Sequence, residues 1–550
     1  MKKALFGRVA LPSALAVLPA LAALLALACQ RPAEPPPEGT PRLVVLIVVD
    51  QMRADYLDRF DRFWQGGLRY LLDNAVRFTD AHHDHAITAT APGHASLATG
   101  CFPSRHGVFT NYWIDRESGE EVYSAADDDW EITPERLECA TLGDWLKKRY
   151  PASRVFAVSA KDRSAVLMAG RKADGAFFYD DSYDGWESAS HGGWESAEYY
   201  YKEEPEWVGE FNDRRLLDRH FGEPWEPLAA SLEDLEAVGV SAFDMGPLAP
   251  DLPIAFGGLA PAPGESFYAA IFASPYLDEH LARFAEHLIG AEALGGDEVP
   301  DLLALGFSAV DAVGHAYGPD SPQLLDTLRR LDVTLGELFE FLDRRVGLDN
   351  VVIALSSDHG AVPVPEVRQA SGLPGRRADA DDVLCMQRVY ERLQGRFGDG
   401  AWLLPGPFVN REAVKTADLE YEDVESAAAE LIGACPSVAE VWTRSELMNA
   451  ETAQDPMGRL FVHSFPPEVA PDFLIQRQEF FLTSRSAAAS HGTAWPYDTH
   501  VPLLIAGAGI ASEVRAGWTR TVDLAPTLAT LVAVEPTGEL DGVDLGLAPR

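Results

Sequence analysis

The chain has 550 residues, of which 45 are basic and 85 acidic, so its formal net charge is −40. This length suffices for one large domain with insertions or for two to three ordinary domains. The acidic excess argues against nucleic-acid binding and favours a soluble surface. It also repels anions at long range, so any phosphate site must supply its own local positive charge.

The first residues have the pattern of an export signal. Two lysines precede an apolar stretch, residues 10–27, that prolines interrupt and small residues close before Cys29. This pattern predicts a signal peptide over residues 1–28 rather than a spanning helix. Lipid attachment to Cys29 and ordinary cleavage remain alternatives. The proline-rich residues 29–42 predict a tether, so we expect an exported, periplasmic protein, either free or anchored to a membrane through Cys29.

Three apolar runs rich in Val, Ile and Leu predict strands that are buried on both faces of a parallel sheet. Such sheets bind ligands just beyond the carboxyl ends of their strands. Acidic or imidazole side chains follow each run: Asp50 follows 43–49, Asp311 follows 302–307, and Asp358 with His359 follows 351–355. The runs therefore predict a metal site at the carboxyl edge of a sheet.

The rest of the chain fits one α/β domain over residues 43–550. Apolar runs alternate with helix-like stretches up to about residue 360, which predicts βα repetition. Two segments, about 180–261 and 362–465, interrupt this alternation and predict insertions. After them we expect the core to resume at Phe473 and to end with the strand at 500–506.

The segment from Thr88 to Gly100 follows a strand-like run and opens a predicted helix, with Pro92 in its first turn. A hydroxyl at a helix N-terminus lies near free amides and the positive end of the helix dipole, which favour an anion. Thr90 is therefore the candidate nucleophile. The alternative is that Thr90 only caps the helix.

Histidines near the predicted strand ends supply further candidate ligands. Asp311 and His315 are four residues apart, so in a helix both could face one ion. His491, beside a glycine, is the expected remaining ligand. His500 is an alternative that we expect to support the structure instead. The crowded histidines of one predicted loop are expected to be supporting or surface residues: His82, His83 and His85.

Three polar side chains could bind a phosphoryl group. The Asn111 amide could donate a hydrogen bond to a non-bridging oxygen. Lys161 and Arg163 follow a strand-like run, and on an extended segment their side chains would point to the same side. The ordinary alternative for this pair is a solvated surface turn.

Four cysteines follow Cys29, which in an exported chain permits two disulfides in any of three pairings: Cys101, Cys139, Cys385 and Cys435.

The nucleophile segment resembles that of a known superfamily. The resemblance lies in Thr90-X-Pro92, Leu97-X-Thr99-Gly100, Pro103 and His106-Gly107. This spacing is similar to the threonine-nucleophile branch of the alkaline phosphatase superfamily, which also contains nucleotide pyrophosphatase/phosphodiesterases. The run from Cys101 to Arg105 also matches the pattern that sulfatases convert to formylglycine. In sulfatases, however, that cysteine stands where this chain has Thr90, so we expect Cys101 to be structural or disulfide-bonded.

The resemblance implies a three-layer α/β/α sandwich and two Zn²⁺ ions. One ion would be held by Asp311, His315 and His491. The other would be held by Asp50, Asp358 and His359, with Thr90 facing it. Such ions would lower the pKa of the Thr90 hydroxyl and stabilise the leaving oxygen.

Lys161 and Arg163 also resemble the Lys-X-Arg pair of bacterial periplasmic phosphate monoesterases, a pair that related diesterases lack. We therefore expect a monomeric phosphatase that hydrolyses small phosphate monoesters through a phospho-Thr90 intermediate. The alternatives are a phosphodiesterase on the same metal frame and an inactive lipoprotein that binds a partner. Sulfatase activity at Cys101 is a minor alternative.

Overall fold

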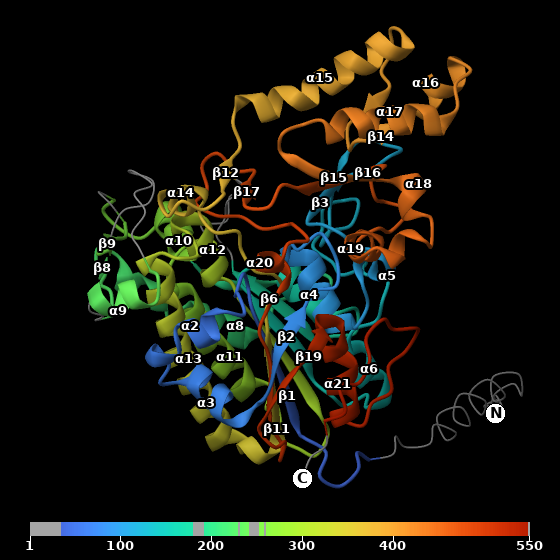
Figure 1. The fold of residues 1–550 in the computed structure, drawn as a ribbon. Helices are drawn as coiled ribbons and strands as arrows, with labels where there is room; N and C mark the ends of the chain where they lie inside the picture. The colour runs from blue at the N-terminus through green and yellow to red at the C-terminus, as the bar shows by residue number, and fades with distance from the viewer. Residues whose placement is uncertain (1–34, 180–191, 229–231, 241–251, 258–259, 548–550) are drawn as a thin grey trace, which may run out of the picture.

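The computed structural model describes residues 35–547, except for 180–191, 229–231, 241–251 and 258–259 (Figure 1). The predicted signal peptide, Cys29 and the start of the predicted tether lie outside the described residues, as do parts of the first predicted insertion. Within the described ranges, no helix is both long and apolar enough to cross a membrane.

A nine-stranded sheet forms the centre of the fold. Its order is β19 (Glu513–Arg520), β2 (Val76–His82), β18 (Leu503–Gly507), β11 (Val351–Ser356), β1 (Leu43–Val49), β10 (Asp301–Phe307), β5 (Val155–Ser159), β6 (Gly175–Tyr179) and β7 (Trp194–Ser196). The five strands from β11 to β6 are mutually parallel, whereas β18 and β7 run antiparallel to their neighbours. The predicted mostly parallel sheet is confirmed.

Side chains of β1 enter two cores in alternation, because successive residues of a strand point to opposite faces. Leu43, Val45, Ile47 and Val49 pack into one core, and the residues between them pack into the other. Helices α3 (Gly67–Asn74), α11 (Pro275–Ala291) and α13 (Pro322–Arg345) cover the first face. Helices α4 (Thr90–Thr99), α6 (Leu142–Arg149), α7 (Asp162–Ala169) and α21 (Leu524–Leu531) cover the second (Figure 1). The α/β/α sandwich is confirmed.

The segment predicted as the second insertion carries α14 (Pro365–Ala370), α15 (Ala380–Phe397), α16 (Arg411–Thr416), α17 (Tyr421–Gly433), β15 (Val438–Thr443), α18 (Arg444–Leu447) and α19 (Pro456–His463). Helices α15 and α17 share a small apolar core and lie above the carboxyl edge of the sheet (Figure 1). A disulfide joins Cys385 to Cys435, while Cys101 and Cys139 are free thiols. Of the two disulfides that the sequence permits, the described residues therefore form one.

Two expectations about the end of the core are wrong. The strand that begins at Phe473, β16 (Phe473–Arg477), pairs with β15 and not with the central sheet. Its apolar pattern would read the same in either sheet, so the sequence could not distinguish them. The central sheet also continues past residue 506, because β19 pairs with β2. Most residues of β19 are exposed at the sheet edge, so this strand lacks the apolar run that marks buried strands.

Candidate active site

Four neighbouring parallel strands end beside one another and bring the predicted polar residues to a single edge of the sheet. In spatial order these strands are β11, β1, β10 and β5. The residues that follow them are Asp358 and His359 after β11, Asp50 after β1, Asp311 and His315 after β10, and Lys161 after β5. Segments separated by up to 309 positions in the sequence thus meet, as the strand-end argument predicts.

The first group of candidate metal ligands consists of Asp311, His315 and His491. Helix α12 (Ala309–Tyr317) places His315 Nε2 3.1 Å from Asp311 Oδ1, and His491 Nε2 lies 3.8 Å from the same oxygen. Nδ1 of His315 donates to the carbonyl oxygen of Ala489, and Nδ1 of His491 donates to that of Thr88. These hydrogen bonds fix the tautomers and leave both Nε2 atoms for an ion.

The second group consists of Asp50, Asp358 and His359, all fully buried. His359 Nε2 lies 3.4 Å from Asp50 Oδ1 and 3.4 Å from Asp358 Oδ2. None of these three atoms has a hydrogen-bond partner. Buried polar atoms without partners are costly unless they bind an ion, so the group fits a cation. Imidazole and carboxylate ligands in this number suit catalytic zinc.

Burial sets the protonation of several of these ligands. It raises the pKa of Asp50 well above its usual value, an effect that Asp311 and Asp358 reinforce and Lys161 opposes. Burial lowers the pKa of both His359 and His491. The two imidazoles are therefore neutral at pH 7, which is the form that coordinates metal ions.

Thr90 lies at the start of α4, as the sequence predicts, but as the first helical residue. The preceding Ala89 is extended, so the helix cap is not Thr90. Thr90 is 1 % exposed, and its Oγ1 lies 3.5 Å from Lys161 Nζ. The helix also packs directly on the second ligand group, because a Cβ at Gly93 would clash with the Asp358 carbonyl oxygen.

Lys161 bridges the two ligand groups. Its Nζ lies 2.5 Å from Asp50 Oδ2 and 2.6 Å from Asp311 Oδ2. Arg163 does not follow on an extended segment, as the sequence analysis expects, because α7 begins at Asp162 and places Arg163 in its first turn. The pair is largely buried and is not a solvated turn.

Asn111 lies beside the nucleophile. Its Oδ1 accepts a hydrogen bond from the Ala91 backbone N–H at 2.9 Å, so the amide N–H groups remain available as donors. Tyr123, which the sequence analysis does not select, donates a hydrogen bond to Asp162. Burial opposes the charge of Arg163, but Tyr123 and Asp162 outweigh it and raise the pKa of Arg163. The guanidinium is therefore charged at every pH of interest.

Gln51 and His94 are further residues that sequence reasoning misses. Gln51 Nε2 donates to Asp311 Oδ1 at 2.5 Å, and its backbone N–H donates to Asp358 Oδ1 at 3.1 Å, so Gln51 links the two groups. It does so with a φ of +64°, a strained conformation for a residue other than glycine. His94 Nδ1 lies 3.2 Å from Asp358 Oδ2. The only sequence signal for Gln51 is its position directly after Asp50.

The other candidate histidines lie outside both groups. His83 and His85 are buried and not on the surface, and His83 Nε2 donates to the Ser357 carbonyl oxygen. His82 belongs to β2 and not to a loop. His500, the alternative ligand, lies beside His82.

Cys101 lies beyond the C-terminal end of α4, whereas Thr90 starts that helix. A helix of ten residues is about 15 Å long. The thiol is buried and free, and it contacts the carbonyl oxygens of Thr99 and Glu539. This position gives no support to a sulfatase centre at Cys101.

A buried carboxylate supports the helix that carries Asp311. Asp278 on α11 accepts hydrogen bonds from the backbone N–H groups of Ser308 and Ala309, and its Oδ2 has no partner. Burial raises the pKa of Asp278 to about 7. The Asp278 carboxyl therefore binds its proton more tightly in the folded state than in the unfolded state. The contribution of this proton to the free energy of unfolding is lost as the pH rises through 7.

We expect the substitution Asp278→Asn to remove this pH dependence. Asparagine keeps an acceptor for both N–H groups and cannot ionise. Between pH 5 and pH 8, the free energy of unfolding of the wild type should fall by about 2–3 kcal/mol relative to that of the variant. Urea denaturation of both proteins at the two pH values measures this change. The same substitution at the exposed Asp129 is the control. A constant difference between Asp278→Asn and the wild type over this pH range would contradict the assignment.

The fold and the two ligand groups around Thr90 define the class of protein: a phosphoester hydrolase of the alkaline phosphatase superfamily. The profile of the type I phosphodiesterase/nucleotide pyrophosphatase family matches residues 44–481. The chain belongs to this family.

Curated relatives match nearly the whole chain. Alkaline phosphatase PafA from Elizabethkingia meningoseptica is 29% identical over 90% of this chain and 93% of its own length. Alkaline phosphatase PhoV from Synechococcus elongatus is 28% identical, with 92% of each chain covered. A crystal structure of wild-type alkaline phosphatase PafA superimposes with a TM-score of 0.81 at 27% identity, covering 92% of this chain and 98% of that one. The resemblance found in the sequence is confirmed, and the chain is an enzyme that hydrolyses phosphate esters.

Proposed function

We propose that the enzyme hydrolyses phosphate monoesters to an alcohol and inorganic phosphate through a phosphothreonine at Thr90. The observation that carries this proposal is the position of Lys161, whose ammonium touches both ligand groups and lies 3.5 Å from Thr90 Oγ1. Arg163 adds a second fixed positive charge nearby in the chain. A phosphoryl group attacked by Thr90 would therefore meet concentrated positive charge despite the acidic surface.

The two ligand groups suit two zinc ions, one at Asp311, His315 and His491 and one at Asp50, Asp358 and His359. Bound zinc would lower the pKa of the attacking hydroxyl or water and stabilise the leaving oxygen.

The chain's own residues supply the remaining chemistry. The oxygen of Thr90 attacks phosphorus in line, the bond to the ester oxygen breaks, and the alcohol leaves after it takes up a proton. Water then attacks the phosphothreonine, which releases inorganic phosphate and restores the hydroxyl. Asn111 donates to a phosphoryl oxygen through its amide, and Lys161 and Arg163 stabilise the charge on the same group.

Charge favours a monoester over a diester. The positive charge of two zinc ions, Lys161 and Arg163 would exceed the negative charge of the three aspartates of the site. A dianionic monoester together with the Thr90 alkoxide would neutralise this excess. A diester has one negative charge and one non-bridging oxygen fewer, so it offers these cations fewer acceptors. The names of the relatives, alkaline phosphatases PafA and PhoV, support the same choice.

The second candidate function is phosphodiester hydrolysis, which the family profile includes by name. Turnover of an aryl phosphate monoester and of the matching diester, with metal analysis of the same protein sample, decides between the two. A higher kcat/KM for the diester would reject the monoesterase assignment. A zinc-loaded protein that is inert toward both would reject both assignments.

Metal removal should abolish activity. We expect dialysis against a chelator to reduce turnover below detection and added Zn²⁺ to restore it. Without an ion, buried polar atoms of Asp50, Asp358 and His359 lie close together without hydrogen-bond partners. Mg²⁺ prefers oxygen ligands and should restore little. Full activity in protein shown to be metal-free would contradict the proposed cofactor.

We also propose that the enzyme acts after export, in the periplasm, where phosphate esters from outside the cell are accessible. The basis is the sequence of residues 1–42 alone. Mass spectrometry of the mature N-terminus distinguishes a lipid-modified Cys29 from a plain cleaved end, and an intact Met1 in exported protein would contradict both.

A further inference from the structure

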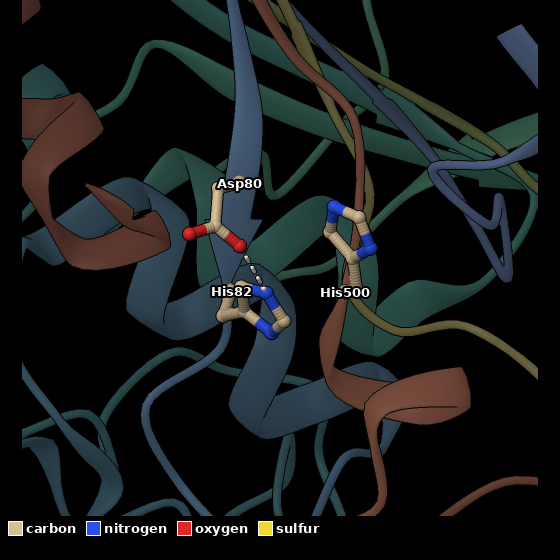
Figure 2. Close-up of side chains that lie close together, drawn as sticks. All are labelled: Asp80, His82 and His500. Carbon is tan, nitrogen blue, oxygen red and sulfur yellow. Dashed lines mark hydrogen bonds and ion pairs between the residues drawn. The ribbon is translucent and has the colours of Figure 1, made fainter. Parts of the chain in front are cut away.

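A third cluster of potential ligands lies at the edge of the central sheet, outside the two groups around Thr90. It consists of Asp80, His82 and His500, whose ligand atoms all lie within 4.8 Å of one another. Figure 2 shows Asp80 and His82 on one strand and His500 on the neighbouring segment, with the three side chains beside one another. Neither the proposed reaction nor its metal ligands use these residues.

Backbone pairing holds the cluster in place. Asp80 and His82 are two positions apart on β2, so their side chains lie on the same face. His500 pairs with His82 in an antiparallel bridge just before β18. On the other side of β2, β19 places Trp518 in register with Asp80. Three adjacent segments of one sheet therefore fix the positions of these residues before any ligand arrives.

We propose that Asp80, His82 and His500 form a third metal site, which binds one Zn²⁺ ion per chain. Two imidazoles and one carboxylate are a ligand set that suits zinc, with a further position left for water. The net charge of the chain, −40, raises the local concentration of cations at its surface. The inference does not depend on the proposed function.

The hydrogen bonds around both imidazoles match those of metal ligands. His500 Nε2 lies 3.1 Å from the Thr79 carbonyl oxygen, which can only accept, so Nε2 carries the proton and Nδ1 is free. Nδ1 of His82 lies 3.2 Å from Thr499 Oγ1, and this hydroxyl can accept the imidazole proton. Nε2 of His82 lies 3.1 Å from Asp80 Oδ1. Such outer partners orient metal-binding histidines and fix their tautomers.

Aromatic rings pack against the imidazole of His82. Trp518 covers one face of the His82 ring with 4.4 Å between ring centroids, and His500 stacks on the other face at 4.5 Å. Because the two imidazole planes differ by only 10°, His500 must tilt to share an ion with His82. The fluorescence of Trp518, which stacks on His82, would then report this movement.

The test compares wild-type protein with Asp80→Asn and His500→Gln. These side chains are partly exposed, and the replacements are polar side chains of similar size. After saturation with Zn²⁺ and desalting, we expect each variant to retain one Zn²⁺ fewer per chain, with phosphatase turnover unchanged. His287→Gln, on α11 and outside all three ligand groups, is the matched control and should retain the wild-type content.

A second measurement uses Cu²⁺, which quenches tryptophan fluorescence. We expect a quenching component in the wild type that is absent from Trp518→Phe and from both ligand variants. Equal Zn²⁺ content in all proteins together with no Trp518-dependent quenching would overturn the third site. Loss of Zn²⁺ from the variants together with loss of turnover would also overturn it, because the substitutions would then have disturbed the catalytic ions.

Discussion

We expect Thr90→Ala to eliminate turnover and to lower kcat by at least about 10⁴-fold, because it removes the oxygen of the proposed phosphoenzyme while leaving both ligand groups intact. Thr90 is buried at the start of α4, and no other hydroxyl is in contact with Lys161 Nζ in the described part of the chain. Zinc content should stay near that of the wild type, since Asp50, Asp358 and His359 remain. Steady-state assays with an aryl phosphate and metal analysis measure both quantities.

Two matched variants separate the nucleophile from its surroundings. Thr90→Ser keeps a hydroxyl at the same position and should keep turnover through a phosphoserine. Thr88→Ala removes a buried hydroxyl two residues earlier, which donates to the Thr493 carbonyl oxygen, and should cost far less activity than Thr90→Ala. Acid quenching followed by mass spectrometry should find phosphate on Thr90. A Thr88→Ala loss equal to that of Thr90→Ala would place the nucleophile elsewhere.

The strand ends were predictable because two patterns coincide in the sequence. Fully apolar runs such as 43–49 occur where a strand is buried on both faces, and β1, β10 and β11 are buried at every position. Functional residues follow such strands directly, so Asp50 and Asp358 could be assigned to one edge without knowledge of the strand order. The assignment of two ligand groups also required the resemblance, since spacing does not show which strands are neighbours.

Other parts of the site have little signal in the sequence. The φ of +64° at Gln51 and its contacts with Asp311 arise only when β1 and α12 are in place, because glutamine is not a residue that marks a left-handed conformation. Arg163 looked like part of an extended pair because helix α7 begins only one residue after Lys161. The burial of His83 and His85 depends on segments that lie hundreds of residues away, such as Ser357.

We expect the double substitution Lys161→Ala, Arg163→Ala to remove the proposed selectivity for monoesters. Lys161 lies 3.5 Å from Thr90 Oγ1, and the charge of Arg163 is maintained by Tyr123 and Asp162. In the proposed reaction both cations bind non-bridging oxygens, of which a monoester presents three and a diester two. We expect kcat/KM for an aryl monoester to fall by about 10³-fold or more, and that for the matching diester to fall by less than about 10-fold.

A change of net charge alone would not produce this split. The control is Arg171→Ala with Lys172→Ala, which removes the same two residue types from exposed positions just beyond the other end of α7. This pair should leave the ratio of monoester to diester turnover unchanged, because screened surface charges act weakly on a bound substrate. Equal losses on both substrates after removal of Lys161 and Arg163 would show that the pair maintains the site as a whole. Its role would then be to hold Asp50 and Asp311 in place, and substrate selectivity would have to come from the residues around Asn111.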